Sequence, residues 1–244
     1  LDYASGSTQP LEQITAALNS AIGSGIRWQD SLQLLGVAER GAVAGNALLS
    51  ESTSLLVGTL NAYGLGVDQV QRVSDVFFRT VGDGTISIGQ LANDFGRIAP
   101  LAASAGVPIE TIGAALAVLT QQGVQPSEAI TYLRSALAAI INPSSQAATL
   151  AQQLGIQFDA QSLKSRGLAA VLNDVQRATG GNVQQMAVLF GGTEALSAVL
   201  GLTGDKAAKF SEELARMQGA AGATDTAFQK FAGALSPYTQ QLRN

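Results

Sequence analysis

The sequence contains no histidine and no cysteine. Their absence excludes nucleophilic sites of the Ser-His-Asp and Cys-His types, zinc sites built on imidazole or thiolate, disulfide bonds and thiol redox chemistry. The composition does not exclude an enzyme whose catalytic groups are carboxylates. The lack of cysteine fits every redox compartment and therefore selects none.

Charged and aromatic residues are scarce. Only 13% of the residues are charged and 5% are aromatic, whereas about a quarter of the residues in an average domain are charged. The net charge is −4, and the 14 basic residues are scattered along the chain. No basic stripe is therefore present to displace counterions from a phosphate backbone. We expect no sequence-specific binding to nucleic acid.

Long apolar runs are missing as well. A helix that spans a bilayer takes about 20 apolar residues, but the run Ala114–Leu119 ends at Thr120 and the run Ala136–Ile141 ends at Asn142. Residues 1–7 lack the basic and apolar regions of a signal peptide, and the first residue is leucine. We interpret the chain as a fragment of a longer protein that does not rest in a membrane.

Glycine and small apolar residues are abundant. Apolar residues make up 46% of the chain, and 27 residues are glycine. Four glycines precede a small apolar residue in a pattern typical of helix ends, namely Gly66, Gly106, Gly123 and Gly155. No stretch alternates with period two for long enough to predict a strand. We predict an all-α fold, a multi-helix bundle of short helices that are punctuated by glycine and proline and that self-associates.

Helical periodicity and stop signals predict the helix boundaries. The expected helices cover residues 10–22, 28–45, 50–63, 68–81, 87–98, 109–122, 127–141, 144–154, 167–178, 183–190, 193–201, 205–218 and 224–243. The last is expected to end or kink near Ser236, and residues 156–160 are expected to form a short extended link. Three segments are expected, N-terminal (1–66), charge-poor central (67–158) and C-terminal (159–244), unless they form one continuous domain.

The same periodicity predicts which side chains face the core. In the first helix these are Leu11, Ile14, Ala17, Leu18 and Ala21, and in the second they are Trp28, Leu32, Leu35 and Val37. The adjacent pair Phe77 and Phe78 is expected to anchor the core further along.

Local signals predict three helix starts. Asp68 is expected to cap the helix that follows it, because its carboxylate can accept from the free amides of a first turn. Ser87 and Gln90 fit the S-x-x-Q capping box. Pro143 is expected in the first turn of a helix, where its missing amide costs nothing.

The middle of the chain is poor in charge. Between Ile98 and Phe158 the only charged residues are Glu110, Glu128 and Arg134, and the first lysine of the chain is Lys164. One interpretation is a helical hairpin core that is buried on most sides or covered by copies of itself. The other is a hairpin, at about residues 107–141, that inserts into a host membrane after a conformational change.

Small residues in this hairpin fit both interpretations. Gly113 and Ala117 lie four residues apart, a spacing that allows the close backbone approach of membrane helices. Small residues equally serve close packing between helices of a water-exposed protein. We keep the buried core as the main interpretation and membrane insertion as the alternative.

The carboxylates predict no active site. Glu212 and Glu213 are adjacent on a helix and face different directions, which is the wrong arrangement for a shared site. Both are expected on a solvated face. Asp83 precedes Gly84 without the further ligands of a calcium loop, and a turn is expected there.

Two further sequence patterns have structural interpretations. Asp94 and Arg97 have the spacing of a surface ion pair. Gly191, Gly192 and Thr193 precede a helix, and without a following lysine or a preceding strand they are expected to form a hinge and a cap rather than an anion site. We predict no catalytic residue, no cofactor and no metal site.

Six elements, in one order, resemble the core region of the tail tape measure proteins of tailed bacteriophages. They are Leu60–Gly64 (LNAYG), Val73–Phe78 (VSDVFF), Ile98–Ala103 (IAPLAA), Leu119–Gly123 (LTQQG), Leu133–Ala138 (LRSALA) and Phe190–Ala195 (FGGTEA). The resemblance extends from about Ala38 to Gly204. It implies a non-enzymatic virion component that helps to determine tail length, organise tail assembly and assist genome ejection.

The resemblance also implies partners and a location. Copies of the chain, often three, are expected to lie side by side. They are expected to contact tail tube proteins and distal tail or baseplate hub proteins. The host membrane is expected as a further partner on ejection. The expected locations are the tail lumen or tail tip of the virion, and the host cytoplasm during assembly.

A ruler should be a long extended helix at about 1.5 Å per residue. With 27 glycines and 6 prolines, the chain is expected to be a folded module, with the coiled-coil measuring segments elsewhere in the protein.

Overall fold

The computed structural model describes residue 7 and residues 9–231. Every regular element in these described ranges is helical, and no strand occurs among them. The α-helices are α2 (Leu11–Gly23), α3 (Trp28–Ala44), α4 (Leu49–Tyr63), α5 (Val70–Asp83), α6 (Ile88–Asp94), α7 (Ala99–Ser104), α8 (Ile109–Gln121), α9 (Pro126–Ile141), α10 (Ser145–Gln153), α11 (Ala160–Arg166), α12 (Leu168–Thr179), α13 (Val183–Phe190), α14 (Thr193–Leu202) and α15 (Ala207–Gln218). Residues 223–231 are also helical. The predicted all-α fold is confirmed.

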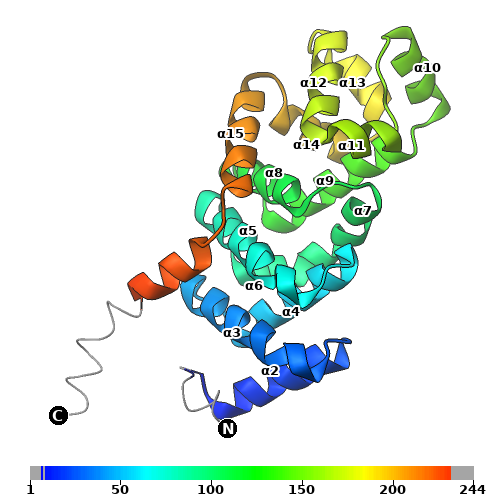
Figure 1. Cartoon of the computed structure of the whole chain (residues 1–244). Coiled ribbons are helices and arrows are strands. Elements are labelled where there is room, and N and C mark those ends of the chain that lie inside the picture. The colour runs from blue at the N-terminus through cyan, green and yellow to red at the C-terminus, as the bar shows by residue number, and fades with distance from the viewer. Residues whose placement is uncertain (1–6, 8, 232–244) are drawn as a thin grey trace.

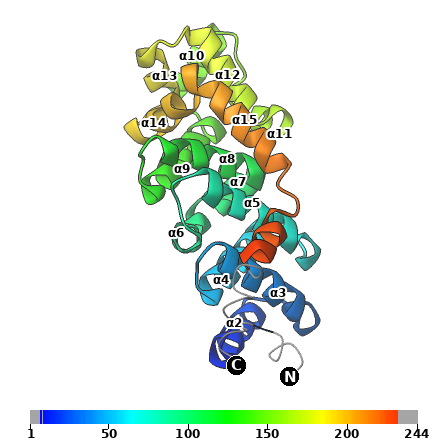
Figure 2. The same ribbon diagram turned by 90° about the vertical axis from the view of Figure 1, so that its left-hand side faces the viewer.

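The helices stack into an elongated body. Helices α2 and α3 form one end, α10 to α13 form the other, and α8 lies between them (Figures 1 and 2). After α14 the chain turns back, so that α15 packs against α8 and α5. Residues 223–231 then lie beside α3, near the end at which the chain begins (Figure 1).

Helix α8 is the centre of the core. All residues from Thr111 to Thr120 are buried, because α5, α9, α14 and α15 each pack against this helix. A helix that is apolar on all sides needs cover on all sides, which explains why the middle of the sequence has so few charges. No helix in the described part of the chain is long and apolar enough to span a membrane.

Small residues allow the close packing around α8. A Cβ atom at Gly113 would lie 2.5 Å from Thr80 Oγ1 of α5 and 3.7 Å from Met217 Sδ of α15. A Cβ atom at Gly201 of α14 would lie 2.4 Å from a methyl carbon of Leu119. The small residues of the hairpin are therefore used for packing inside this chain.

Local signals predicted some helix starts correctly. The Ser87–Gln90 capping box is confirmed, with Ser87 N donating to Gln90 Oε1 over 2.9 Å and Gln90 N donating to Ser87 Oγ over 3.2 Å. The prediction for Asp68 is wrong, because Asp68 lies within a 3-10 turn (Val67–Gln69) and α5 begins after it without a side-chain cap. The prediction for Pro143 is also wrong, because Ser144 caps α10 and the proline therefore precedes the helix.

The inward faces of the first two helices are partly as predicted. Ile14, Ala17, Ala21, Leu35 and Val37 are buried, and Leu18 packs partly buried against the core. Leu11, Trp28 and Leu32 were predicted to face inward, but they are 63%, 62% and 44% exposed. In α3 the buried stripe runs through Ser31, Leu34, Leu35 and Ala38. This stripe lies away from Trp28 and Leu32, and helices α2, α4 and α5 pack against α3.

Two parts of the helix order differ from the sequence predictions, and one part is not described. The helix expected at 87–98 is divided by a 3-10 turn (Phe95–Arg97), and α7 follows with Pro100 in its first turn. Helix α11 was not predicted; Asp159 caps it, its carboxylate accepting from Ser162 N over 2.7 Å. For the last predicted helix, the portion from 232 on, including Ser236, lies outside the described residues.

Candidate functional site

The return of the chain onto α5 is built around a buried carboxylate. Asp75 is 1% exposed, and its oxygens accept from Gly222 N over 2.8 Å, Thr224 N over 2.9 Å and Gln71 Nε2 over 3.1 Å. Asp75 therefore caps the N-terminal end of the helical residues 223–231, as a cap supplied from another helix. Beside it, Ser74 Oγ and Thr224 Oγ1 are 3.3 Å apart.

Sequence analysis did not single out Asp75. It is the one charged residue of the otherwise uncharged stretch Val73–Phe78, and it lies among residues that helical periodicity places in the core. A charge at such a position must find partners, because an unpaired buried charge is costly. That signal was available, but the partners are about 150 residues away in the sequence.

A cluster of charges lies where α15 crosses α5. Glu213 was predicted on a solvated face, but it is 0% exposed, so this prediction is wrong. The buried stripe of α15 runs through Phe210, Glu213 and Met217, and the helical spacing carries the glutamate inward. Its neighbour Glu212 is 60% exposed, as predicted.

Ion pairs connect this cluster. Lys209 Nζ lies 2.8 Å from Glu213 Oε1, and Arg216 Nη2 lies 3.0 Å from Asp83 Oδ1. Burial raises the pKa of Asp83 above its ordinary value; Arg216 opposes this rise and Glu213 adds to it. Helix α5 ends at Asp83, and the chain bends at Gly84 as expected. The Asp83 side chain pairs with Arg216 of α15.

The remaining predicted residues have structural positions. Asp94 and Arg97 form the expected surface pair at 3.2 Å. Gly191 has φ of +71° and ends α13, and Gly192 immediately precedes α14. The predicted break between two helices is therefore present, but no side chain caps α14. Phe77 is buried and meets the ring of Phe95 edge to face at 4.9 Å.

Phe78 is only half-buried. Within residues 7 and 9–231, no group of three or more acidic side chains lies close enough together to hold a metal ion.

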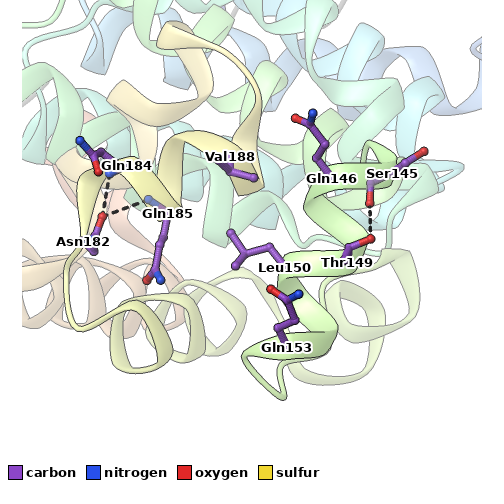
Figure 3. A pocket seen from close by; sticks show the side chains of 9 residues that line it. All are labelled: Ser145, Gln146, Thr149, Leu150, Gln153, Asn182, Gln184, Gln185 and Val188. Carbon is purple, nitrogen blue, oxygen red and sulfur yellow. Dashed lines mark hydrogen bonds between the residues drawn. The ribbon is translucent and has the colours of Figure 1, made fainter.

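A groove of 680 Å³ lies between α10 and α13 (Figure 3). Its lining is uncharged: Ser145, Gln146, Thr149, Leu150, Gln153, Asn182, Gln184, Gln185 and Val188. Asn182 caps α13, with its Oδ1 accepting from Gln184 N over 3.0 Å and from Gln185 N over 3.1 Å (Figure 3). The wall holds the hydroxyls of Ser145 and Thr149 but no acid or base beside them to activate them, so we interpret this groove as a contact surface.

Comparisons with known proteins identify a matching family and several relatives. The sequence model of a family described as "Phage-related minor tail protein" matches residues 4–191. The chain is 29% identical over 194 residues to the tape measure protein of Pneumococcus phage Dp-1, an alignment that covers 76% of this chain and 17% of that protein. It is 28% identical over 233 residues to the probable tape measure protein of Clostridium phage phiCD119, covering 91% of this chain and 25% of that protein.

A third relative is the probable tape measure protein of Escherichia phage P2. It is 24% identical over 190 residues, which cover 75% of this chain and 23% of that protein. The chain thus spans a quarter or less of the length of these curated relatives. No solved structure matches it. Since the family model covers well over half of the 244 residues, the chain belongs to the family of phage-related minor tail proteins.

Proposed function

We propose that the chain is the core module of a tail tape measure protein. In this role it is a structural component of the phage tail that helps to determine tail length, organise tail assembly and assist genome ejection. The observation that carries the proposal is the similarity to three tape measure proteins, from phages named for three different bacterial hosts.

The fold supports a folded module rather than the ruler itself. Helix α8 is covered by helices from both the centre and the C-terminal part of the sequence, so the chain folds back on itself instead of extending at about 1.5 Å per residue. Measuring segments then belong to other parts of the parent protein. The three segments 1–66, 67–158 and 159–244 remain our proposal for how the module is organised.

A non-enzymatic role fits the hydrogen bonds and ion pairs that the interior carboxylates form within the fold. Asp75 accepts three hydrogen bonds, and Asp83 and Glu213 form ion pairs within the fold. None of them lines the groove between α10 and α13. The partners of these groups lie within the fold, and we assign none of the three carboxylates to catalysis.

The proposed partners are further copies of the chain, three in one tail, together with tail tube proteins and distal tail or baseplate hub proteins. Apolar side chains are available for such contacts, since Leu11, Trp28 and Leu48 are each more than half exposed. The proposed location is the lumen or tip of the virion tail, after assembly in the host cytoplasm. Membrane insertion of residues 107–141 has no support in the fold, because their apolar side chains are largely buried by the rest of the chain.

Quantitative mass spectrometry of purified particles tests the proposal. Peptides from residues 11–231 should co-purify with mature tails at a small, constant number of copies per tail, calibrated against the tube protein. Peptides found only in the lysate of infected cells would refute a virion role. Release of dye from liposomes by the isolated chain would instead support the membrane alternative, whereas the proposed module should leave vesicles intact.

A further inference from the structure

The end of the described chain forms a separate layer over the core. We name residues 204–231 the C-terminal strap; it comprises a 3-10 turn (Gly204–Lys206), α15 and the helical residues 223–231. The strap runs back from α14 across α8 and α5 to α3 (Figures 1 and 2). It covers the face at which Gly113 of α8 meets α5.

Glycine residues lie at both joints of the strap. Gly204, just before α15, has φ of +58°, and Gly222, just after it, has φ of +78°. Glycine adopts these conformations without steric cost and also adopts many others. The two helical parts of the strap can therefore reorient at their joints without unfolding.

The apolar contact of the strap is narrow. Phe210, Met217 and Ala220 are its buried apolar residues in and next to α15. Met217 Sδ lies 3.8 Å from Thr80 Oγ1 of α5, over the small face at Gly113. Helix α15 is one of the four helices that cover α8, and its fully buried apolar contribution consists of these few side chains.

Unsatisfied polar atoms are concentrated beneath the strap. Seven buried side-chain atoms in the described residues lack a well-oriented hydrogen bond, and six of them lie on the strap or on residues that face it. These six belong to Arg40, Arg79, Asp83, Glu213 and Asp225. Three of these six, Arg40 Nε, Asp225 Oδ1 and Glu213 Oε1, are nevertheless in ion pairs. The seventh is Thr53 Oγ1. The interface of the strap thus differs from the rest of the core.

Ion contacts offset only part of this cost. Arg40 Nε lies 2.6 Å from Asp225 Oδ1, and Lys209 Nζ lies 2.8 Å from Glu213 Oε1. Glu213 Oε2 and Asp83 Oδ2 stay without a hydrogen bond. Buried charges without full hydrogen bonding are costly to hold. Once the strap has lifted, water can hydrate all of these groups.

We propose that the C-terminal strap is a conformational device that detaches as a unit while the helices beneath it stay folded. Its charged interface and glycine joints make detachment the lowest-energy opening of the module. Detachment uncovers the small-residue face of α5 and α8 and separates residues 223–231 from α3. This inference goes beyond the proposed role in the tail and does not rest on it.

Hydrogen exchange of the 244-residue chain, read by mass spectrometry, tests the proposal. Amides of residues 207–231 should exchange at least tenfold faster than those of α8, because they open locally. The absence of cysteine allows a lock, Ser74→Cys with Thr224→Cys, at the position where the two hydroxyl oxygens are 3.3 Å apart. Oxidation should slow exchange in the strap, and reduction of the same protein should restore it.

A second, milder variant tests the proposal even if the disulfide lock does not form. Asp225→Asn weakens the partly exposed contact with Arg40 and, because the strap detaches as a unit, should speed exchange throughout residues 207–231 while α4 stays unchanged. The control is Asp205→Asn, an exposed position on the strap, which should leave exchange as it was. Exchange of α15 at the rate of α8, or exchange in the strap that is the same with and without the oxidised lock, would overturn the proposal.

Discussion

Replacing Gly84 with alanine should destabilise the chain through a clash between α5 and α8. The backbone at Gly84 has φ of −111° and ψ of −178°, a conformation that alanine adopts freely. A Cβ atom there would lie 2.7 Å from Thr80 O, 2.9 Å from Thr120 Oγ1 and 3.0 Å from Ala117 Cα. Two of these three atoms belong to the backbone of packed helices, so they cannot move away cheaply.

The expected cost follows from overpacking. Extra methyl groups in a well-packed site typically cost about 1–3 kcal/mol. For a domain of this size, a loss of about 2 kcal/mol lowers Tm by roughly 4–8 °C. Thermal unfolding followed by circular dichroism, together with urea titration, measures both quantities.

A matched control lies two residues earlier. Gly82 is within α5, and a Cβ atom there would meet no atom within 4 Å. Gly82→Ala should therefore leave stability unchanged or raise it by up to about 1 kcal/mol through helix propensity. A Gly84→Ala protein as stable as the wild type would refute the close approach of α5 to α8.

Three other substitutions test separate parts of the structure. Tyr63 Oη donates to Val107 O over 3.2 Å, so Tyr63→Phe should cost about 1 kcal/mol in urea unfolding; no loss would mean that the hydrogen bond is absent. Burial raises the pKa of Asp83, so its ionisation removes stability as the pH rises through the folded-state pKa. Asp83→Asn should accordingly be more stable than the wild type at neutral pH. The difference in stability should vanish below the ordinary aspartate pKa of about 3.9. An Asp83→Asn protein that is less stable at neutral pH would contradict this prediction. Trp28 is the only tryptophan of the chain and is 62% exposed, so Trp28→Ala should change the free energy of unfolding by less than about 0.5 kcal/mol. Acrylamide should quench the fluorescence of Trp28 in the folded wild type nearly as well as in the unfolded chain.

Features that depend on neighbouring residues could be predicted from the sequence. The Ser87–Gln90 capping box and the helix end at Gly191 involve groups within a few residues of each other. Most helix boundaries, such as those of α9, follow from glycine, proline and periodicity in the same way. The burial of α8 was also predictable, because a run without charges has to be covered.

Features that depend on distant contacts could not be predicted. The partners of Asp75, Gly222 and Thr224, are brought to it only by the return of the chain. Glu213 was expected in solvent because its charge suggested exposure, but the packing of α15 on α8 and α5 places it inside. Trp28 was expected in the core because helical periodicity placed it on the inward face, but it is exposed, since the neighbouring helices pack against another face of α3. None of the residues under the strap was identified beforehand as a group.

The central claim is that these residues form a folded tail module that does not itself count length. It is tested most directly by electron microscopy of particles whose parent gene lacks residues 107–154 in frame, with tail length and infectivity scored together. The deletion removes α8, α9 and α10, so we predict either loss of tails or tails of normal length that fail to deliver DNA. Tails shortened in proportion, by about 70 Å at 1.5 Å per residue, would show that the segment is part of the ruler, and normal infectious particles would contradict the account altogether.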